Sequence, residues 1–269
     1  ASAMLRSLVG SEMCIRDRYN NAYEASSVQA FAAAGDPSLL RVAEVDYVKP
    51  EQMQSMEFGF RGKLSRTFTV DAAVYRNDFQ DFINTQVVLS PLYGEVGDGG
   101  LSVLAMANGD FETWSSYTNS PAEISSWGIS LGAQTKIFGN FDLSANYTKA
   151  KLEFEQELYP DFRTNWNTPE HKIKAQFGNT ELFKNFGFNV AWRYWSEYLW
   201  QASFGDGIVP DTHVIDAQFN LTVPKWKSTI KVGATNLGGE EYFTAFGSGF
   251  IGTQYYISWT ANNLSLIHI

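Results

Sequence analysis

Residues 126–154 alternate strictly between apolar and small or polar side chains along two arms joined by a tight turn. In the first arm, Trp127, Ile129 and Leu131 alternate with serine and glycine. Successive side chains leave a pleated strand on opposite faces, so a period of two over this length predicts a β-strand. The polar turn at residues 138–140 is typical of the link that closes a hairpin. This stretch therefore predicts a hairpin with one apolar and one polar face.

The same alternation recurs along the rest of the chain and predicts about nine antiparallel strands. Most are close to ten residues long, whereas strands of soluble proteins average about five or six. About ten tilted residues are needed to cross the hydrocarbon of a bilayer as a barrel strand. Residues 19–45 and 90–121 show no sustained period, and we expect irregular loops there. The predicted strands lie within residues 56–63, 67–83, 126–137, 141–154, 172–177, 186–194, 215–221, 230–235 and 254–260.

The connections between these strands alternate between short and long, which is typical of outer-membrane barrels with short periplasmic turns and longer extracellular loops. A soluble β-sandwich also has one apolar and one polar side, so face alternation alone does not decide. Strand length, loop alternation and low charge together favour a transmembrane β-barrel. Its apolar faces would meet lipid and its polar faces would line a wet lumen. Aromatic residues at the predicted strand ends fit interface girdles: Phe138, Phe141, Phe186, Trp192, Tyr194, Trp200 and Trp226.

Composition narrows the function further. Charged residues make up 18% of the chain, against about 25% in an average soluble domain. The net charge of −9 argues against a nucleic-acid partner, because no basic face is available to neutralise phosphates. The sequence contains no run of about 20 apolar residues, so it predicts no transmembrane helix. Strands of membrane barrels give a much weaker hydropathy signal, so that absence does not bear on a barrel.

Both ends of the chain fall outside the periodic pattern. Residues 5–18 (LRSLVGSEMCIRDR) and 264–269 (LSLIHI) resemble translated sequencing-adapter read-through. We therefore expect residues 1–18 and 264–269 to be non-native and residues 19–263 to be the C-terminal part of a barrel; real terminal tails are the alternative. The one cysteine, Cys14, lies in the first of these segments, so no disulfide, catalytic thiol or cysteine metal site is predicted elsewhere.

Six short motifs follow one another along residues 47–263. They are Lys49-Pro-Glu51 with Glu57-Phe-Gly-Phe60, Asp71–Tyr75 with Asp81–Ile83, Ser126-Trp-Gly128, Pro169-Glu-His171, Val232–Leu237 with Tyr242, and Thr244–Gly247 with Gly252–Tyr256. In order and spacing these motifs resemble the late barrel strands of TonB-dependent outer-membrane receptors. The chain departs from that family where Ile129 and Ser130 replace an acidic step. The last motif is similar to the barrel end of Bacteroidetes-type receptors, relatives of the SusC-like group.

This resemblance implies a barrel of about 22 strands closed by an N-terminal plug, of which the chain holds the last nine or so. An odd number of strands does not complete a bacterial single-chain barrel, so two sheet edges would be open. The implied function is TonB-dependent import of a scarce nutrient, such as a siderophore or oligosaccharide, across the bacterial outer membrane. The implied partners are outer-membrane lipid, an extracellular nutrient ligand, the TonB complex acting through the plug, and a surface lipoprotein lid.

Two rival functions remain at this point. A passive porin-like channel would share the barrel and lack the plug. A soluble, carbohydrate-binding β-sandwich would instead place Phe188, Val190, Trp192 and Tyr194 in a protein core.

The sequence predicts no catalytic, cofactor-binding or metal site. His171 and His213 stand alone at strand starts, and His268 lies in the suspect tail; none has metal-ligand spacing. Glu153, Glu155 and Glu157 are interpreted as solvated loop charges. The segments Gly97–Gly100 and Gly205–Gly207 are interpreted as turns. Ser102 and Ser125 lack the motif that surrounds a nucleophilic serine. Aromatic loop residues offer either a stacking surface for a sugar or siderophore or simple loop packing: Tyr93, Trp114, Tyr117, Tyr159, Trp166, Trp200 and Phe204.

Overall fold

The computed structural model describes residues 21–97, 99–202 and 205–261. The chain divides into two compact units, each built from three separate segments. The loop unit comprises Ala1–Gln54, Asp78–Ser125 and Glu153–Asn165. The sheet unit comprises Ser55–Asn77, Ser126–Leu152 and Trp166–Ile269.

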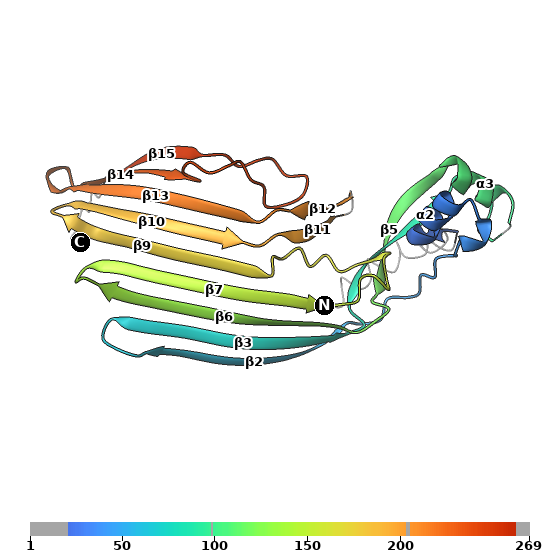
Figure 1. The fold of residues 1–269 in the computed structure, drawn as a ribbon, viewed down its shortest axis with the longest axis horizontal. Helices are drawn as coiled ribbons and strands as arrows, with labels where there is room; N and C mark the ends of the chain where they lie inside the picture. The colour runs from blue at the N-terminus through green and yellow to red at the C-terminus, as the bar shows by residue number, and fades with distance from the viewer. Residues whose placement is uncertain (1–20, 98, 203–204, 262–269) are drawn as a thin grey trace, which may run out of the picture. The chain divides into compact units, whose positions relative to one another are not determined.

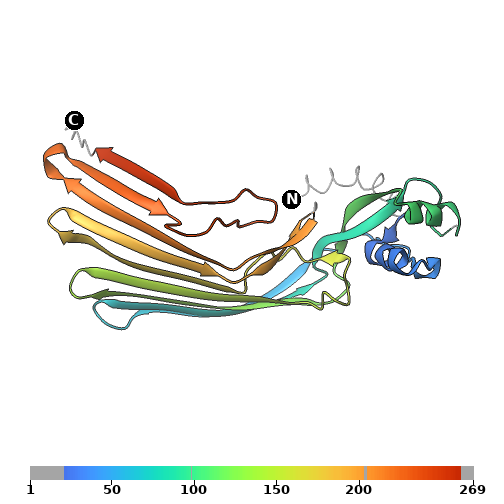
Figure 2. The ribbon, with the colours of Figure 1, turned by 45° about the horizontal axis from the view of Figure 1, so that its top comes forward.

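Within the described residues, nine strands form one sheet, in the order in which they follow along the chain (Figures 1 and 2). This confirms the predicted number of long strands. Their lengths run from 8 residues in β14 to 14 in β6, as expected for strands that cross a bilayer. The strands are β2 (Gln52–Lys63), β3 (Phe68–Gln80), β6 (Ile124–Ile137), β7 (Phe141–Glu153), β9 (His171–Phe183), β10 (Phe186–Trp195), β13 (Thr212–Val223), β14 (Ser228–Thr235) and β15 (Gln254–Ala261).

Short turns at one end of the strands and longer connections at the other reproduce the predicted alternation. The turn between β6 and β7 places Phe138 at φ 47° and Gly139 at φ 89°, and two residues in this region are what a tight hairpin turn requires. Asn185 (φ 69°) serves the turn between β9 and β10, because asparagine tolerates the left-handed region. The turn between β13 and β14 contains a short 3-10 helix, Pro224–Trp226.

Strand register confirms the predicted separation of apolar and polar faces. Residues directly opposite one another on paired strands point to the same face of a sheet. One register row of the apolar face is Leu143, Phe177, Val190, Ala217, Ala234 and Tyr255. The adjacent row of the polar face is Asp142, Gly178, Asn189, Gln218, Gly233 and Tyr256.

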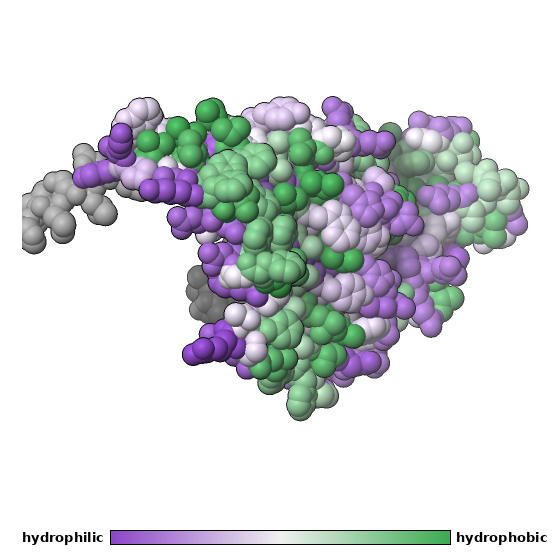
Figure 3. All heavy atoms as spheres, turned by 60° about the vertical axis from the view of Figure 1, so that its left-hand side comes forward, coloured by the Kyte–Doolittle hydropathy of each residue, from purple (hydrophilic) through white to green (hydrophobic). Residues whose placement is uncertain are grey.

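The apolar face stays uncovered. Val190 is 39% exposed, Phe219 53% and Ile257 76%, and Figure 3 shows broad patches of hydrophobic residues on the molecular surface. A soluble sandwich would bury this row under a second sheet. The exposure of Val190 therefore argues against the sandwich and favours contact with lipid.

In its described residues, the loop unit combines a small sheet with two α-helices and has a buried core. Strand β4 (Ile83–Pro91) pairs with β5 (Phe111–Asn119) and also with the two-residue strands β1 (Tyr23–Glu24) and β8 (Phe162–Arg163). Helix α2 (Ala25–Ala34), the short 3-10 helix η1 (Pro37–Leu39) and helix α3 (Leu101–Asn108) complete it. The buried apolar residues form two clusters: Tyr23, Val28, Phe31, Leu89 and Met106, and Ala22, Ala43 and Val88.

The expectation of irregular loops at residues 19–45 and 90–121 was therefore wrong for the stretches that form β1, α2, η1, α3 and β5, whereas residues 43–45 and 92–97 are irregular as expected. Both helices end at a glycine in the left-handed conformation, Gly35 (φ 70°) and Gly109 (φ 77°), a common helix C-terminus. They are too short to show a clear helical period, and packing between distant segments stabilises them.

Two further boundaries differ from the prediction. The second strand was expected to continue to Ile83, but β3 ends at Gln80 and Asp81 adopts φ 52°, which breaks the strand before β4. The connection at residues 200–211 was expected to be a loop, yet it contains a hairpin of β11 (Tyr198–Ala202) and β12 (Gly205–Val209). No helix in the described residues is long and apolar enough to span a membrane.

Candidate functional site

The loop unit contains a cleft of 730 Å³. Its walls come from the start of α2, the segment after η1, the middle of β4, the end of β5, and the connection that leads into β8. The volume lies within the range of small-molecule pockets, about 300–1,000 Å³. The lining residues are Glu24, Ser26, Arg41, Val42, Glu44, Gln86, Thr118, Asn119, Pro121, Leu158, Tyr159, Pro160, Asp161 and Phe162.

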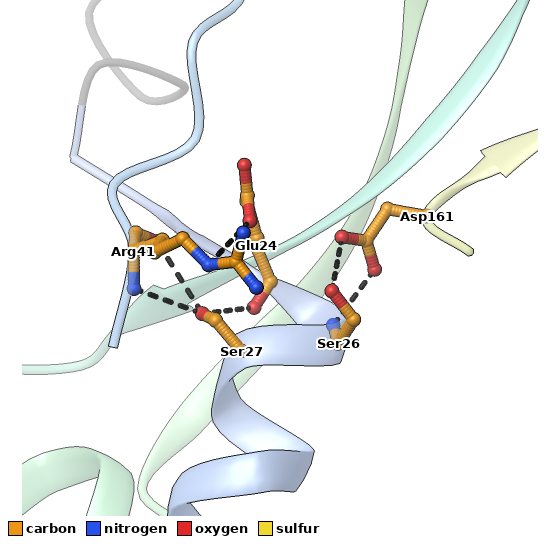
Figure 4. Close-up of polar contacts among 5 residues, drawn as sticks. All are labelled: Glu24, Ser26, Ser27, Arg41 and Asp161. Carbon is orange, nitrogen blue, oxygen red and sulfur yellow. Dashed lines mark hydrogen bonds and ion pairs between the residues drawn. The ribbon is translucent and has the colours of Figure 1, made fainter. Parts of the chain in front are cut away.

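Asp161 joins three segments of this cleft. Its two carboxylate oxygens accept hydrogen bonds from the backbone N–H of Ser26 at 2.7 Å and from the Ser26 hydroxyl at 2.6 Å (Figure 4). The N-cap residue of α2, Glu24, makes no side-chain cap, so Asp161 supplies the acceptor that the first helical turn needs. The Asp161 carbonyl also accepts from the N–H of Val87 on β4 at 3.0 Å.

A second polar group fixes the opposite wall. The Ser27 hydroxyl donates to the Glu24 carbonyl at 2.7 Å and accepts from the Arg41 N–H at 3.0 Å. The Arg41 guanidinium lies 3.5 Å from the Glu24 carboxylate. Burial raises the pKa of Glu24, as do the charges of Asp161 and Glu44, while Arg41 opposes the rise. With three carboxylates and one guanidinium, the cleft is acidic.

Among the described residues, ion pairs join neighbouring strands on the polar face of the sheet unit. Arg61 pairs with Asp71 across β2 and β3, Lys136 lies 3.1 Å from Asp142 across β6 and β7, and Arg193 lies 2.9 Å from Asp216 across β10 and β13. Asp216 also accepts a hydrogen bond from the N–H of Asn236 at 3.1 Å. These pairs connect β2 with β3, β6 with β7, and β10 with β13.

Both described histidines belong to aromatic groups on the apolar face. The Tyr147 hydroxyl and His171 Nδ1 are 2.9 Å apart, and the His213 ring stacks on Tyr194 with centroids 4.7 Å apart. Trp192 stacks on His213 as well, at 5.9 Å. His171, Tyr194 and His213 lie at the strand ends that adjoin the longer connections, which is where an interface girdle is expected.

A cation lies beside the first of these groups. The Lys149 ammonium is 5.1 Å from the centroid of the Trp127 ring and 3.1 Å from the Glu170 carboxylate. The hydrogen bond and charge of Lys149 hold the pKa of Glu170 below its usual value. Among the residues that the structure describes, no three His, Cys, Asp or Glu side chains come together as a metal site.

The other polar residues singled out from the sequence make structural contacts, lie exposed, or belong to turns and strands. The Ser125 hydroxyl donates to Glu153 at 2.9 Å, whereas Glu155 and Glu157 are exposed. Ser102 is buried and lies 2.9 Å from the Tyr23 hydroxyl. Positive φ angles at Gly97 and Gly99 mark a turn region, whereas the turn expected at Gly205–Gly207 was wrong, because these residues begin strand β12.

The aromatic loop residues do not form one surface within either unit. Trp114 packs against the core cluster of Ala22, Ala43 and Val88, and Tyr159 stacks on Phe154 at 5.8 Å while lining the cleft. The Tyr93 hydroxyl donates to Asp110 at 2.8 Å, and Tyr117 is exposed. Trp166 and Trp200 belong to the sheet unit, and Phe204 and His268 lie outside the described residues.

Sequence reasoning missed the cleft. Ser26 and Asp161 are separated by 135 positions, and no local pattern pairs residues over such a distance. A serine at the second position of a helix that lacks a capping side chain was the one available signal.

Comparison with known proteins identifies the chain's relatives. Residues 13–237 match the family model described as "TonB dependent receptor-like, beta-barrel". No curated protein sequence matches the chain.

Solved structures resemble the fold at low sequence identity. The copper transporter OprC aligns with a TM-score of 0.54 and 17% identity, covering 80% of this chain and 31% of OprC. The FrpB iron transporter from Neisseria meningitidis aligns at 0.55 and 12%, with 80% and 32% covered. The ferric-catecholate import receptor Fiu from K12 E. coli aligns at 0.55 and 14%, with 84% and 30% covered. The chain thus spans about a third of the length of these structures.

Proposed function

Since the chain belongs to the TonB-dependent receptor-like β-barrel family of the Gram-negative outer membrane, we propose that it is the C-terminal part of a receptor barrel that imports a scarce nutrient. The nutrient is a siderophore, an oligosaccharide or a solute of similar size. Ligand binding at the outer surface is transduced to a plug domain and energised through the TonB complex.

The open sheet is the observation that carries this proposal. In the described residues β2 and β15 are the end strands, each paired on one side only. Unpaired edge strands expose backbone donors and acceptors, and inside a membrane every such group must be satisfied by protein. Further strands of the same receptor would pair with both edges and close a plugged barrel of about 22 strands. The apolar face then meets lipid, and the polar face lines the lumen.

Several finer assignments belong to the same proposal. A Bacteroidetes-type, SusC-like receptor would work with a surface lipoprotein lid over the extracellular loops. The family consists of receptors rather than enzymes, and we expect no catalytic activity. Residues 1–18 and 264–269 are proposed to be non-native, and residues 19–263 to be barrel; both end segments lie outside the described residues. A long read across the genomic locus tests this, because native ends would appear unchanged in genomic DNA.

Uptake measurements test the transport mechanism. The receptor gene identified by the long read is deleted, and growth is compared on a panel of iron chelates and oligosaccharides as limiting nutrients. We expect loss of growth on one nutrient class, and the same loss when the TonB complex is inactivated. Uptake that persists without TonB would instead support the passive channel.

A further inference from the structure

We propose that the polar face carries an oxyanion-binding site on β9 and β10, formed by Lys172, Lys174, Arg193 and Trp195, which binds a carboxylate- or phosphate-bearing solute. The inference rests on the proposed function in one respect: the polar face must line the lumen for a transported solute to reach it. It specifies the chemistry of that solute, which the family assignment leaves open.

Strand register brings the four residues together. Lys174 lies directly opposite Arg193, and Lys172 lies directly opposite Trp195. Residues opposite one another on antiparallel strands have Cβ atoms about 4.5–5.5 Å apart. Residues two apart on one strand share a face, so the four side chains occupy one patch. On the next strand, Asn146 stands opposite Lys174 and Thr148 opposite Lys172.

The patch offers donors whose acceptors are missing. Among the described residues, Arg193 Nε and the Trp195 indole nitrogen are buried atoms without a hydrogen-bond partner. The Arg193 guanidinium uses Nη2 for both oxygens of Asp216, which leaves its Nε free. Buried polar atoms are nearly always hydrogen-bonded in proteins, so each orphan needs an explanation.

The two lysines lack a counter-charge. Both are exposed, and in the part of the chain that the structure describes neither forms an ion pair. The carboxylate beside Arg193 on this face, Asp216, is already engaged by the Arg193 guanidinium. The patch is therefore positive on a chain whose net charge is −9.

These groups define the ligand's chemistry. Ammonium, guanidinium and indole N–H groups only donate hydrogen bonds. Charge-assisted bonds to carboxylate or phosphate oxygens are the strong ones for lysine and arginine. The patch sits where β9 begins and β10 ends, next to the longer connections of the sheet. In the proposed orientation this is the extracellular end, where an incoming solute would first meet the lumen wall.

Calorimetry on the intact receptor in detergent tests the site, with citrate and inorganic phosphate as probes. We expect Lys172→Gln/Lys174→Gln to weaken citrate binding at least about tenfold. Lys172→Arg/Lys174→Arg should restore it, because the charge returns. Lys231→Gln is the matched control, since Lys231 lies on the same face of β14 and also forms no ion pair with a described residue; a change of less than about twofold is expected.

Three results would overturn the proposal. Unchanged citrate affinity in the glutamine double variant would remove these lysines from any site. An equal loss in Lys231→Gln would show a diffuse field instead of a site. The unmodified receptor could also bind no citrate, while its structure shows a plug carboxylate in contact with Lys172. That result would mean that the patch binds the plug domain and not a solute. Because binding is measured without transport, each result is distinguishable from a failure of TonB-dependent uptake.

Discussion

The sheet unit and the loop unit treat apolar side chains in opposite ways. In the loop unit Tyr23 is 3% exposed and Phe31 6% exposed, and both belong to a closed core. In the sheet unit large apolar residues of the strands lie open, with Phe58 at 84% exposed. The hydrophobic effect drives the first arrangement in water, whereas lipid provides the apolar surroundings that the second requires. Apolar residues are buried in one unit and exposed in the other. This difference indicates that water surrounds the loop unit and that lipid covers the apolar face of the sheet.

Truncating a core aromatic is the strongest test of this contrast. Phe31→Ala should destabilise the loop unit by about 3–5 kcal/mol, because it removes a buried ring and leaves a cavity. The measurement is hydrogen-exchange protection of the α2 and β4 amides in the intact receptor. Phe58→Ala is the matched control and should leave that protection unchanged. Equal effects would mean that Phe31 is not in a core.

A charge on the apolar face tests the other half of the comparison. Val190→Arg should cost about 2–4 kcal/mol in a bilayer, since Val190 lies midway along β10 and would place a guanidinium in hydrocarbon. Unfolding by urea in lipid vesicles measures it. Asn189→Arg, one residue away on the polar face, should be nearly neutral. A larger loss for Asn189→Arg would reverse the assignment of the two faces.

The cap of α2 provides a test with a smaller expected effect. It concerns a polar contact that stabilises a helix of the loop unit and has no counterpart in the strands of the sheet unit. Asp161→Ala should destabilise the first turn of α2 by about 0.5–2 kcal/mol. Faster proteolysis at residues 21–34 reports the change. Glu157→Ala, an exposed change in the same connection, is the control, and matching proteolysis of the two variants would contradict the capping role.

Acid titration gives the smallest expected effect. Burial raises the pKa of Glu24, so its ionisation disfavours the folded loop unit. The resulting gain in stability is fully present below the unfolded value of 4.5 and is lost as pH rises through the higher folded pKa. Glu24→Gln should therefore stabilise the loop unit near pH 7 relative to the unmodified receptor, and this advantage should vanish near pH 4. A constant difference between these pH values would contradict the raised pKa.

The sequence predicted the sheet well because its signal is local. A period of two in residues such as Phe186, Phe188 and Val190 depends only on strand geometry and on a two-phase environment. The same signal assigned each strand's faces, which the register then confirmed. It did not predict the break at Asp81, where one backbone conformation ends β3.

The loop unit and its cleft could not be predicted in the same way. The contact between Tyr23 and Ser102 spans 79 positions, and that between Ser26 and Asp161 spans 135. Helices as short as α3 are marginal without such partners. Their stability depends on tertiary packing, which a single sequence does not display. The unpaired donors of Arg193 and Trp195 likewise became apparent only once their surroundings were known.

The order of strands in the sheet has a kinetic consequence. Each long strand pairs with the next long strand along the chain, so every pairing needs the closure of only the intervening connection. The entropy of closing a loop grows slowly with its length, and topologies rich in near-neighbour contacts form faster. The sheet can therefore grow by adding one strand at a time to a single advancing edge. In that process the β4–β5 insertion delays only one addition, that of β6 onto β3.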